Sequence, residues 1–186
     1  MKELSLNILD IAENSAKAKA SLVRISISET DDTLTLIIED DGTGMTKEVL
    51  LGVTDPFYTT RTTRKVGMGI PLLKFAAEQT GGSISIESKH FSEYPENHGT
   101  TVTAIFYKNH IDFTPLGDVI SSVTTLIQGH PNIDFLFEHS FDGRKVSLDT
   151  RDLRAVLDDV PLDTFEVLIW IKDNLSEQYN QNQKQK

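Results

Sequence analysis

Residues 34–45 read Leu-Thr-Leu-Ile-Ile-Glu-Asp-Asp-Gly-Thr-Gly-Met, an alternating run that ends in a glycine-containing loop. Apolar side chains at every second position predict a strand with one buried face. Asp40 stands at the end of this strand, next to Gly42 and Gly44. Glycine lets the backbone turn sharply and lets a flat ring approach it without an intervening Cβ. An aspartate fixed there could accept a hydrogen bond from an exocyclic amine, although Asp-Gly is also a common turn dipeptide.

The flanking sequence predicts an α/β fold. Helical spacing of apolar residues alternates with period-two strand patterns on both sides of the glycine loop. We expect a two-layer sandwich with helices on one face of a mixed sheet. The predicted helices are 4–19, 46–51 and 68–80, and the predicted strands are 23–27, 34–38, 83–88 and 100–107.

The sequence beyond about residue 112 predicts a small α+β extension. A helix over 116–127, a hairpin of strands 133–139 and 145–148, and a helix over 165–175 are expected there. We therefore divide the chain into a domain of residues 1–110, an extension of residues 111–178 that would serve as a docking surface, and a disordered tail of residues 179–186.

Composition excludes several classes of function. The chain has 186 residues, a net charge of −10 and no cysteine, so disulfides and thiolate metal sites are excluded. The acidic balance argues against a nucleic-acid surface. No apolar run approaches the roughly 20 residues that cross a bilayer, and no signal pattern opens the chain. We expect a cytoplasmic protein that binds neither membrane nor nucleic acid; its oligomeric state does not follow from the sequence.

Asp10 and Asn14 form a candidate pair on the first predicted helix. Residues four apart lie on one helical face and can converge on one ligand. A carboxylate can orient a water molecule, and an amide oxygen can join the coordination shell of a hard cation. A solvated helix face explains the same pattern.

A second glycine segment opens the helix predicted at 68–80. Gly67 and Gly69 would bare backbone N–H groups at the helix start, which favours anion binding. The window 56–77 contains no acidic residue but includes Arg61 and Lys65, so a bound polyphosphate is one interpretation and a lid that is basic by chance is the other.

The order of these motifs resembles the GHKL group of ATP-binding proteins, which contains gyrase, histidine kinases and mismatch-repair ATPases. Five segments follow the family order over residues 4–107. The similar segments are residues 9–15 (asparagine box), 40–45 (first glycine box), 55–60 (phenylalanine box), 67–70 (second glycine box) and 99–101 (Gly-Thr-Thr). The resemblance implies the Bergerat fold, with ATP between the helices and a lid.

The resemblance also implies roles for single residues. Asn14 would hold Mg²⁺ against the phosphates, and Asp40 would bind the adenine amine. Gly42 and Gly44 would line the base pocket, and Thr101 would support its adenine side.

The phosphate end of the implied site lies in the second glycine segment. Gly67 and Gly69 would receive the phosphates, and Arg61 would lie near the γ-phosphate. Lys65 replaces the first glycine of the family's second box and could contact phosphate or point into solvent.

One departure from the family puts turnover in question. Hydrolytic members have glutamate four residues before the asparagine, whereas this chain has Asp10, which is one methylene shorter. Asp10 is the candidate catalytic residue. None of the five histidines lies in a His-Glu or His-Asp pattern on a helix, so we do not expect autophosphorylation in cis.

The C-terminal part resembles free-standing ATP-binding proteins found beside iron hydrogenase and NADH-linked oxidoreductase subunits. This implies a separate protein partner, such as an oxidoreductase or hydrogenase-associated subunit. Three hypotheses remain: a kinase-type regulator that uses ATP and Mg²⁺ and acts in trans, a slow ATPase or nucleotide sensor, and a degenerate scaffold that binds no nucleotide.

Overall fold

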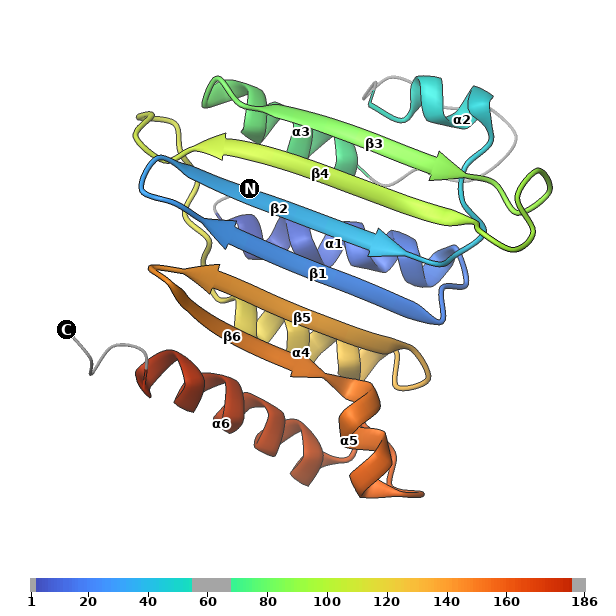
Figure 1. The fold of residues 1–186 in the computed structure, drawn as a ribbon, viewed down its shortest axis with the longest axis vertical. Helices are drawn as coiled ribbons and strands as arrows, with labels where there is room; N and C mark the ends of the chain where they lie inside the picture. Colours follow the sequence, from blue (N-terminus) through green and yellow to red (C-terminus); the bar gives the residue numbers. More distant parts are fainter. Residues whose placement is uncertain (1–2, 55–67, 182–186) are drawn as a thin grey trace.

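The computed structural model describes residues 3–54 and 68–181 of the chain (Figure 1). Twelve elements lie in these ranges. In chain order they are α1 (Leu4–Lys17), β1 (Leu22–Glu29), β2 (Thr33–Asp40), α2 (Lys47–Gly52), α3 (Gly69–Gln79), β3 (Ser83–Lys89), β4 (Gly99–Tyr107), α4 (Val119–Gly129), β5 (Asp134–Phe141), β6 (Arg144–Asp149), α5 (Thr150–Leu157) and α6 (Phe165–Gln181).

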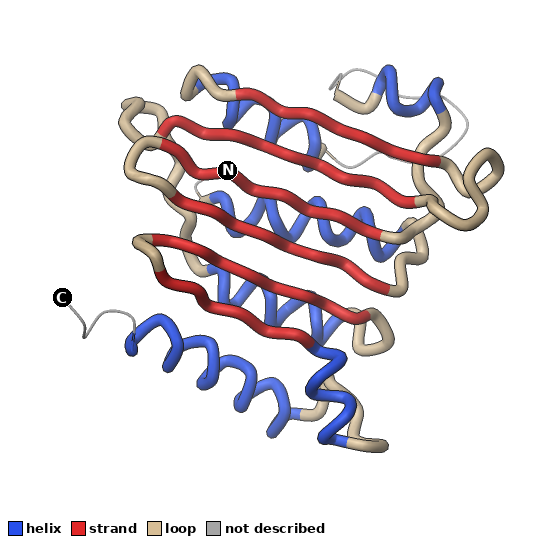
Figure 2. Tube along the Cα trace, viewed as in Figure 1, coloured by secondary structure: helices blue, strands red, loops and turns tan. Residues whose placement is uncertain are grey.

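The six strands form one mixed sheet. Its order is β3-β4-β2-β1-β5-β6, and only the β1–β5 pair is parallel among the described strands. Helices α1, α3 and α4 lie together behind the sheet in Figures 1 and 2. The predicted fold class, helices on one face of a mixed sheet, is confirmed.

The core lies between that helical layer and the sheet. Alternate residues of the central strands point toward the helices and are buried, as the period-two pattern predicts. Leu4, Ile8 and Ile11 of α1 meet them at helical spacing and are also buried. The glycine loop after β2 therefore begins at the end of a strand that pairs with β1 on one side and with β4 on the other.

The predicted extension continues the same sheet. β5 pairs with β1 from Leu22 opposite Asp134 onward. The first turn of α1 is also tied to the segment that leads into the extension, because Leu4 N–H donates to the Pro115 carbonyl at 2.9 Å and Ser5 N–H to the Leu116 carbonyl at 2.8 Å. These bonds satisfy donors that a helix start leaves free. The division into residues 1–110 and 111–178 stays a prediction.

Two C-terminal features differ from the sequence-based expectation. Helix α5 was not predicted; its cap is Asp149, whose side chain accepts from Arg151 N–H. Helix α6 runs to Gln181, six residues beyond the expected end, so the first three residues of the predicted tail are helical. Tyr179 explains the longer helix, because its ring stacks on Phe141. Residues 182–186 lie outside the described part.

A polar cluster joins the sheet to α6. His139 is buried; its Nδ1 lies 2.8 Å from the Tyr179 hydroxyl and its Nε2 lies 3.1 Å from Glu29 Oε1. Lys108 Nζ lies 2.7 Å from the second oxygen of Glu29. The hydrogen bond with His139, together with Lys108, lowers the pKa of Glu29 to about 2. The ionised form of Glu29 is thus favoured by folding.

We predict that Glu29→Gln destabilises the protein at pH 7 and makes it less sensitive to acid. The folded pKa of Glu29 lies below its ordinary value of 4.5, so its stabilisation is present above about pH 4.5 and is lost as the pH falls toward 2. The free energy of unfolding in urea should fall by about 1–2 kcal/mol at pH 7, and the gap to wild type should narrow at pH 3.

The matched control is Glu39→Gln on the neighbouring strand, which removes the exposed ion pair with Arg24. An exposed pair contributes little, so this change should stay within about 0.5 kcal/mol. Equal losses in both variants, or a gap that persists at pH 3, would contradict the role assigned to Glu29.

Candidate functional site

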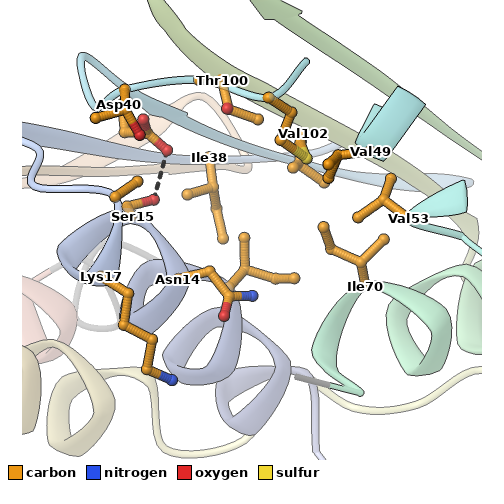
Figure 3. Close-up of a pocket in the computed structure, with 15 residues that line it drawn as sticks. Asn14, Ser15, Lys17, Ile38, Asp40, Val49, Val53, Ile70, Thr100 and Val102 are labelled. Atoms are coloured by element: carbon orange, nitrogen blue, oxygen red, sulfur yellow. Dashed lines mark hydrogen bonds between the residues drawn. The ribbon is translucent and has the colours of Figure 1, made fainter. Parts of the chain in front are cut away.

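A pocket of about 170 Å³ opens between α1 and the far end of β2 (Figure 3). Helix α2, the start of α3 and β4 complete its walls. The lining residues are Ile11, Asn14, Ser15, Lys17, Ala18, Ile38, Asp40, Thr43, Gly44, Met45, Val49, Val53, Ile70, Thr100 and Val102. The structure thus brings three of the predicted site residues, Asn14, Asp40 and Gly44, into one cavity.

Asp40 is the fixed acceptor of this pocket. The Ser15 hydroxyl donates to Asp40 Oδ2 at 2.7 Å, and Gly42 N–H donates to Asp40 Oδ1 at 2.9 Å. Burial raises the pKa of Asp40 above its ordinary value, against these hydrogen bonds, which lower it. Because the two donors hold both oxygens in place, the carboxylate presents a set of lone pairs with one orientation to the cavity.

The glycine loop packs against the connection between β3 and β4. Gly44 has a φ of +66°, and a Cβ there would lie 2.0 Å from the Lys89 carbonyl oxygen. Met45 N–H donates to the Ser88 hydroxyl at 2.7 Å, and the ring Nδ1 of His98 donates to the Gly42 carbonyl at 2.6 Å. Glycine at position 44 is therefore required by close packing as well as by backbone conformation.

Apolar side chains form the two faces of the cavity beside Asp40. Ile38 and Val102 project from the sheet, and Val49, Val53 and Ile70 face them from the helical side (Figure 3). A slot with apolar faces and one fixed acceptor suits a flat ring that carries an amine.

Thr100, rather than Thr101, shares the pocket with Asp40. Thr100 and Asp40 lie opposite each other in the β2–β4 pair, so their side chains share a face of the sheet. Thr101 points to the other face, as successive strand residues do, and lines a separate polar cavity with Glu39 and Glu87. The Gly-Thr-Thr segment thus borders the pocket through Thr100, and the role expected of Thr101 stays a prediction.

The helix side of the pocket carries Asn14 and Lys17. Both project from α1 away from Asp40 in Figure 3. The Asn14 amide oxygen could bind a cation, and the Lys17 ammonium could bind an anion. Glu13 points toward the end of α4 instead of into the pocket, because its carboxylate lies 2.9 Å from His130 Nε2.

Asp10 lies beside the start of α3 rather than in the lining of the pocket. It is exposed, and a Cβ added to Gly69 would come 3.0 Å from the Asp10 Cβ. Gly69 therefore lets α3 begin close to α1. The N-cap Met68 makes no side-chain hydrogen bond, and backbone N–H groups at a helix start of this kind favour an anion.

Part of the predicted site lies outside the described residues. Residues 55–67, which are not described, include Arg61, Lys65 and Gly67 as well as the phenylalanine box at 55–60. Their roles stay predictions. Among residues 3–54 and 68–181, no group of three or more His, Asp or Glu side chains could hold a metal ion, and no helix could span a membrane.

Sequence reasoning missed Ser15 and Thr100 as pocket residues. Ser15 follows Asn14 directly and lies on the side of α1 that faces β2, where its apolar neighbours signalled burial. For Thr100, only the register of β4 against β2 decides which threonine faces the pocket.

Comparison with known proteins agrees with this geometry. Residues 1–110 match the family described as histidine kinase-, DNA gyrase B-, and HSP90-like ATPase. Sporulation kinase C of Bacillus subtilis is 30% identical over 91 residues, which are 48% of this chain and 20% of that protein. The heme sensor protein HssS of Staphylococcus saprophyticus is 31% identical over 88 residues, which are 47% of this chain and 18% of that protein. The chain thus spans about a fifth of the length of these curated relatives.

Two solved structures share the fold. The Aquifex aeolicus MutL ATPase domain complexed with ADP has a TM-score of 0.55 at 16% identity, over 84% of this chain and 69% of that chain. The N-terminal domain of a DNA repair protein has a TM-score of 0.55 at 16% identity, over 80% of this chain and 53% of that chain. Since the family match covers 110 of 186 residues, this chain belongs to the histidine kinase-, DNA gyrase B-, and HSP90-like ATPase family.

Proposed function

We propose that this protein binds ATP with Mg²⁺ and acts as a kinase-type regulator on a separate protein partner. The observation that carries the proposal is the fixed carboxylate of Asp40 at one end of an apolar slot, with Asn14 at the other end. Adenine carries an exocyclic amine that can donate a hydrogen bond to the Asp40 carboxylate. Guanine has a carbonyl oxygen at the same ring position and cannot donate this bond.

The pocket residues fit the two parts of the ligand differently. The sheet end, with Asp40 and Val102, suits the base. The helix end, with Asn14, Lys17 and the start of α3, suits the phosphates and their cation. A protein of the same fold, the MutL ATPase domain, was solved with ADP, which supports a nucleotide in this fold.

A slow ATPase or nucleotide sensor is the second candidate, and Asp10 favours it. Asp10 is exposed and shorter than the glutamate of hydrolytic relatives, so it could hold an attacking water only loosely. In this case ATP would change affinity for a partner without transferring phosphate, which requires different affinities for ATP and ADP.

We predict that label from γ-labelled ATP moves to a partner chain when this protein is mixed with the product of a neighbouring gene. Electrophoresis followed by autoradiography measures the transfer. Asp10→Asn should lower the transfer while leaving ATP affinity unchanged, because Asp10 does not line the pocket. Release of free phosphate alone, with no labelled partner, would exclude the kinase function and leave the ATPase.

We predict that Asp40→Asn weakens ATP binding by at least about tenfold, the equivalent of about 1.4 kcal/mol. The amide turns one acceptor oxygen into a donor that faces the adenine amine. Isothermal titration calorimetry with ATP and Mg²⁺ measures the loss. Glu39→Gln is the matched control, because Glu39 is adjacent to Asp40 but does not line the pocket. If both variants bind as the wild type does, adenine does not occupy the Asp40 end.

We predict that Asn14→Ala removes the dependence of ATP affinity on Mg²⁺. The wild type should bind ATP more tightly in Mg²⁺ than in EDTA, since an amide oxygen at the mouth of the pocket completes the shell of the cation. The variant should bind equally in both buffers. Asn109→Ala, which alters an exposed contact with Asp32, should retain the difference. A variant at position 14 that still responds fully to Mg²⁺ would remove Asn14 from the metal site.

A further inference from the structure

A second cavity lies at the opposite region of the molecule from the nucleotide pocket, where β5, β6, α5 and α6 meet. Its volume is about 380 Å³. The residues that line it, which we call the C-terminal groove, are Leu136, Glu138, Ser147, Leu148, Asp149, Asp152, Leu153, Trp170 and Asn174. All four elements belong to the extension and lie together at one edge of the sheet in Figure 1.

Large apolar side chains are exposed on α5, on α6 and on the segment that connects them. Trp170, the only tryptophan of the chain, is 50% exposed, and Phe165 and Val156 are 70% and 84% exposed. Ile169 and Val160 are exposed as well. Five exposed apolar residues within one stretch of α5, α6 and their connection are a feature that is typical of protein interaction sites.

The same stretch is strongly acidic. Residues 149–177 contain eight acidic and three basic residues, which is half of the net charge of −10 carried by the whole chain. In the groove itself, Asp149 is paired with Arg151 and Glu138 with Lys145. Asp152 makes no salt bridge among the described residues, and Arg151, which attracts it electrostatically, is bonded to Asp149. No basic side chain lines the groove, so its field favours a cation.

Addition of a partner strand to β6 is disfavoured by Gln178. Its Oε1 accepts from Ser147 N–H at 2.9 Å, and its Nε2 donates to the Ser147 carbonyl at 3.0 Å. These bonds occupy backbone groups that an edge strand would otherwise offer to another chain. A partner would therefore meet this surface through side chains.

We infer that the C-terminal groove docks an amphipathic, arginine-bearing segment of a partner protein. Apolar residues of the segment would cover Phe165, Ile169 and Val156. An arginine would stack on the Trp170 indole and pair with Asp152, because a planar guanidinium combines both contacts better than an ammonium does. The inference names the docking chemistry of the partner in the proposed function and so rests on that proposal, but it does not depend on nucleotide binding.

Trp170 provides a direct test, because every change in tryptophan fluorescence reports on this groove. The probe is a synthetic helical peptide of about 14 residues with leucine on one face and arginine on the other. The full-length protein, without nucleotide, should show a blue-shifted Trp170 emission that saturates with the peptide. A lysine version should bind more weakly, and a glutamate version should not bind.

Two charge-matched variants separate the groove from general attraction to an acidic protein. Glu138→Gln with Asp152→Asn removes two charges from the groove, whereas Glu87→Gln with Glu96→Gln removes two near the opposite edge. Affinity, measured by anisotropy of a labelled peptide, should fall at least about tenfold in the groove variant and in Trp170→Ala. It should stay within about twofold in the distal variant. Retained ATP affinity in the groove variant would show that it is folded.

Three results would overturn the inference. Equal losses in the two charge-matched variants would mean unspecific attraction, and saturable binding without a change in Trp170 emission would place the peptide elsewhere. Self-association in sedimentation velocity that Trp170→Ala abolishes would assign the surface to a second copy of this chain. Each result leaves the ATP titration of the wild type as a separate measure of the proposed nucleotide site.

Discussion

The partly buried carboxylate of Asp40 is the constraint on which the site depends. A carboxylate removed from water is costly unless hydrogen bonds compensate it, and here they come from Ser15 on α1 and from the backbone of Gly42. The Ser15 hydroxyl reaches Asp40 only when α1 packs against the end of β2. The Gly42 N–H reaches Asp40 only when the glycine loop turns back toward the strand. The position of helix, strand and loop thus follows from satisfying one acid, and the apolar slot is the space that remains beside it.

The parallel pairing of β1 with β5 has a similar effect on the rest of the chain. It joins the extension to the centre of the sheet instead of leaving it as a separate body. The buried Phe135 and Phe137 of β5 then continue the core that begins with Val23 and Ile25 of β1. The acidic and apolar residues of β6, α5 and α6 therefore lie at the far edge of the sheet, away from the pocket that Asp40 lines.

Much of this arrangement was predictable from the sequence, because the period of apolar residues reports directly on burial. The place of Asp40 at a strand end followed from that period, whereas Asn14 was singled out by its spacing from Asp10 and by the family resemblance. Thr100 did not follow from the period, since only the pairing of β4 with β2 selects it over Thr101. Helix α5 was missed because it is short and charged. It depends on tertiary contacts such as the bond from Arg154 Nε to Asp134 at 2.7 Å, which no local pattern reveals.

Helix α1 is the element through which the pocket and the extension could influence each other. One end of α1 presents Asn14 and Ser15 to the pocket. Its first turn donates to the carbonyls of Pro115 and Leu116, and the Ser122 hydroxyl of α4 donates to the Ser5 carbonyl at 2.9 Å. Glu13 is bonded to His130 at the end of α4. Helix α4 packs in turn against α6, whose buried Ile171 and Leu175 belong to the same core. Helix α1 thus contacts the pocket directly and, through α4, the helix that carries Trp170.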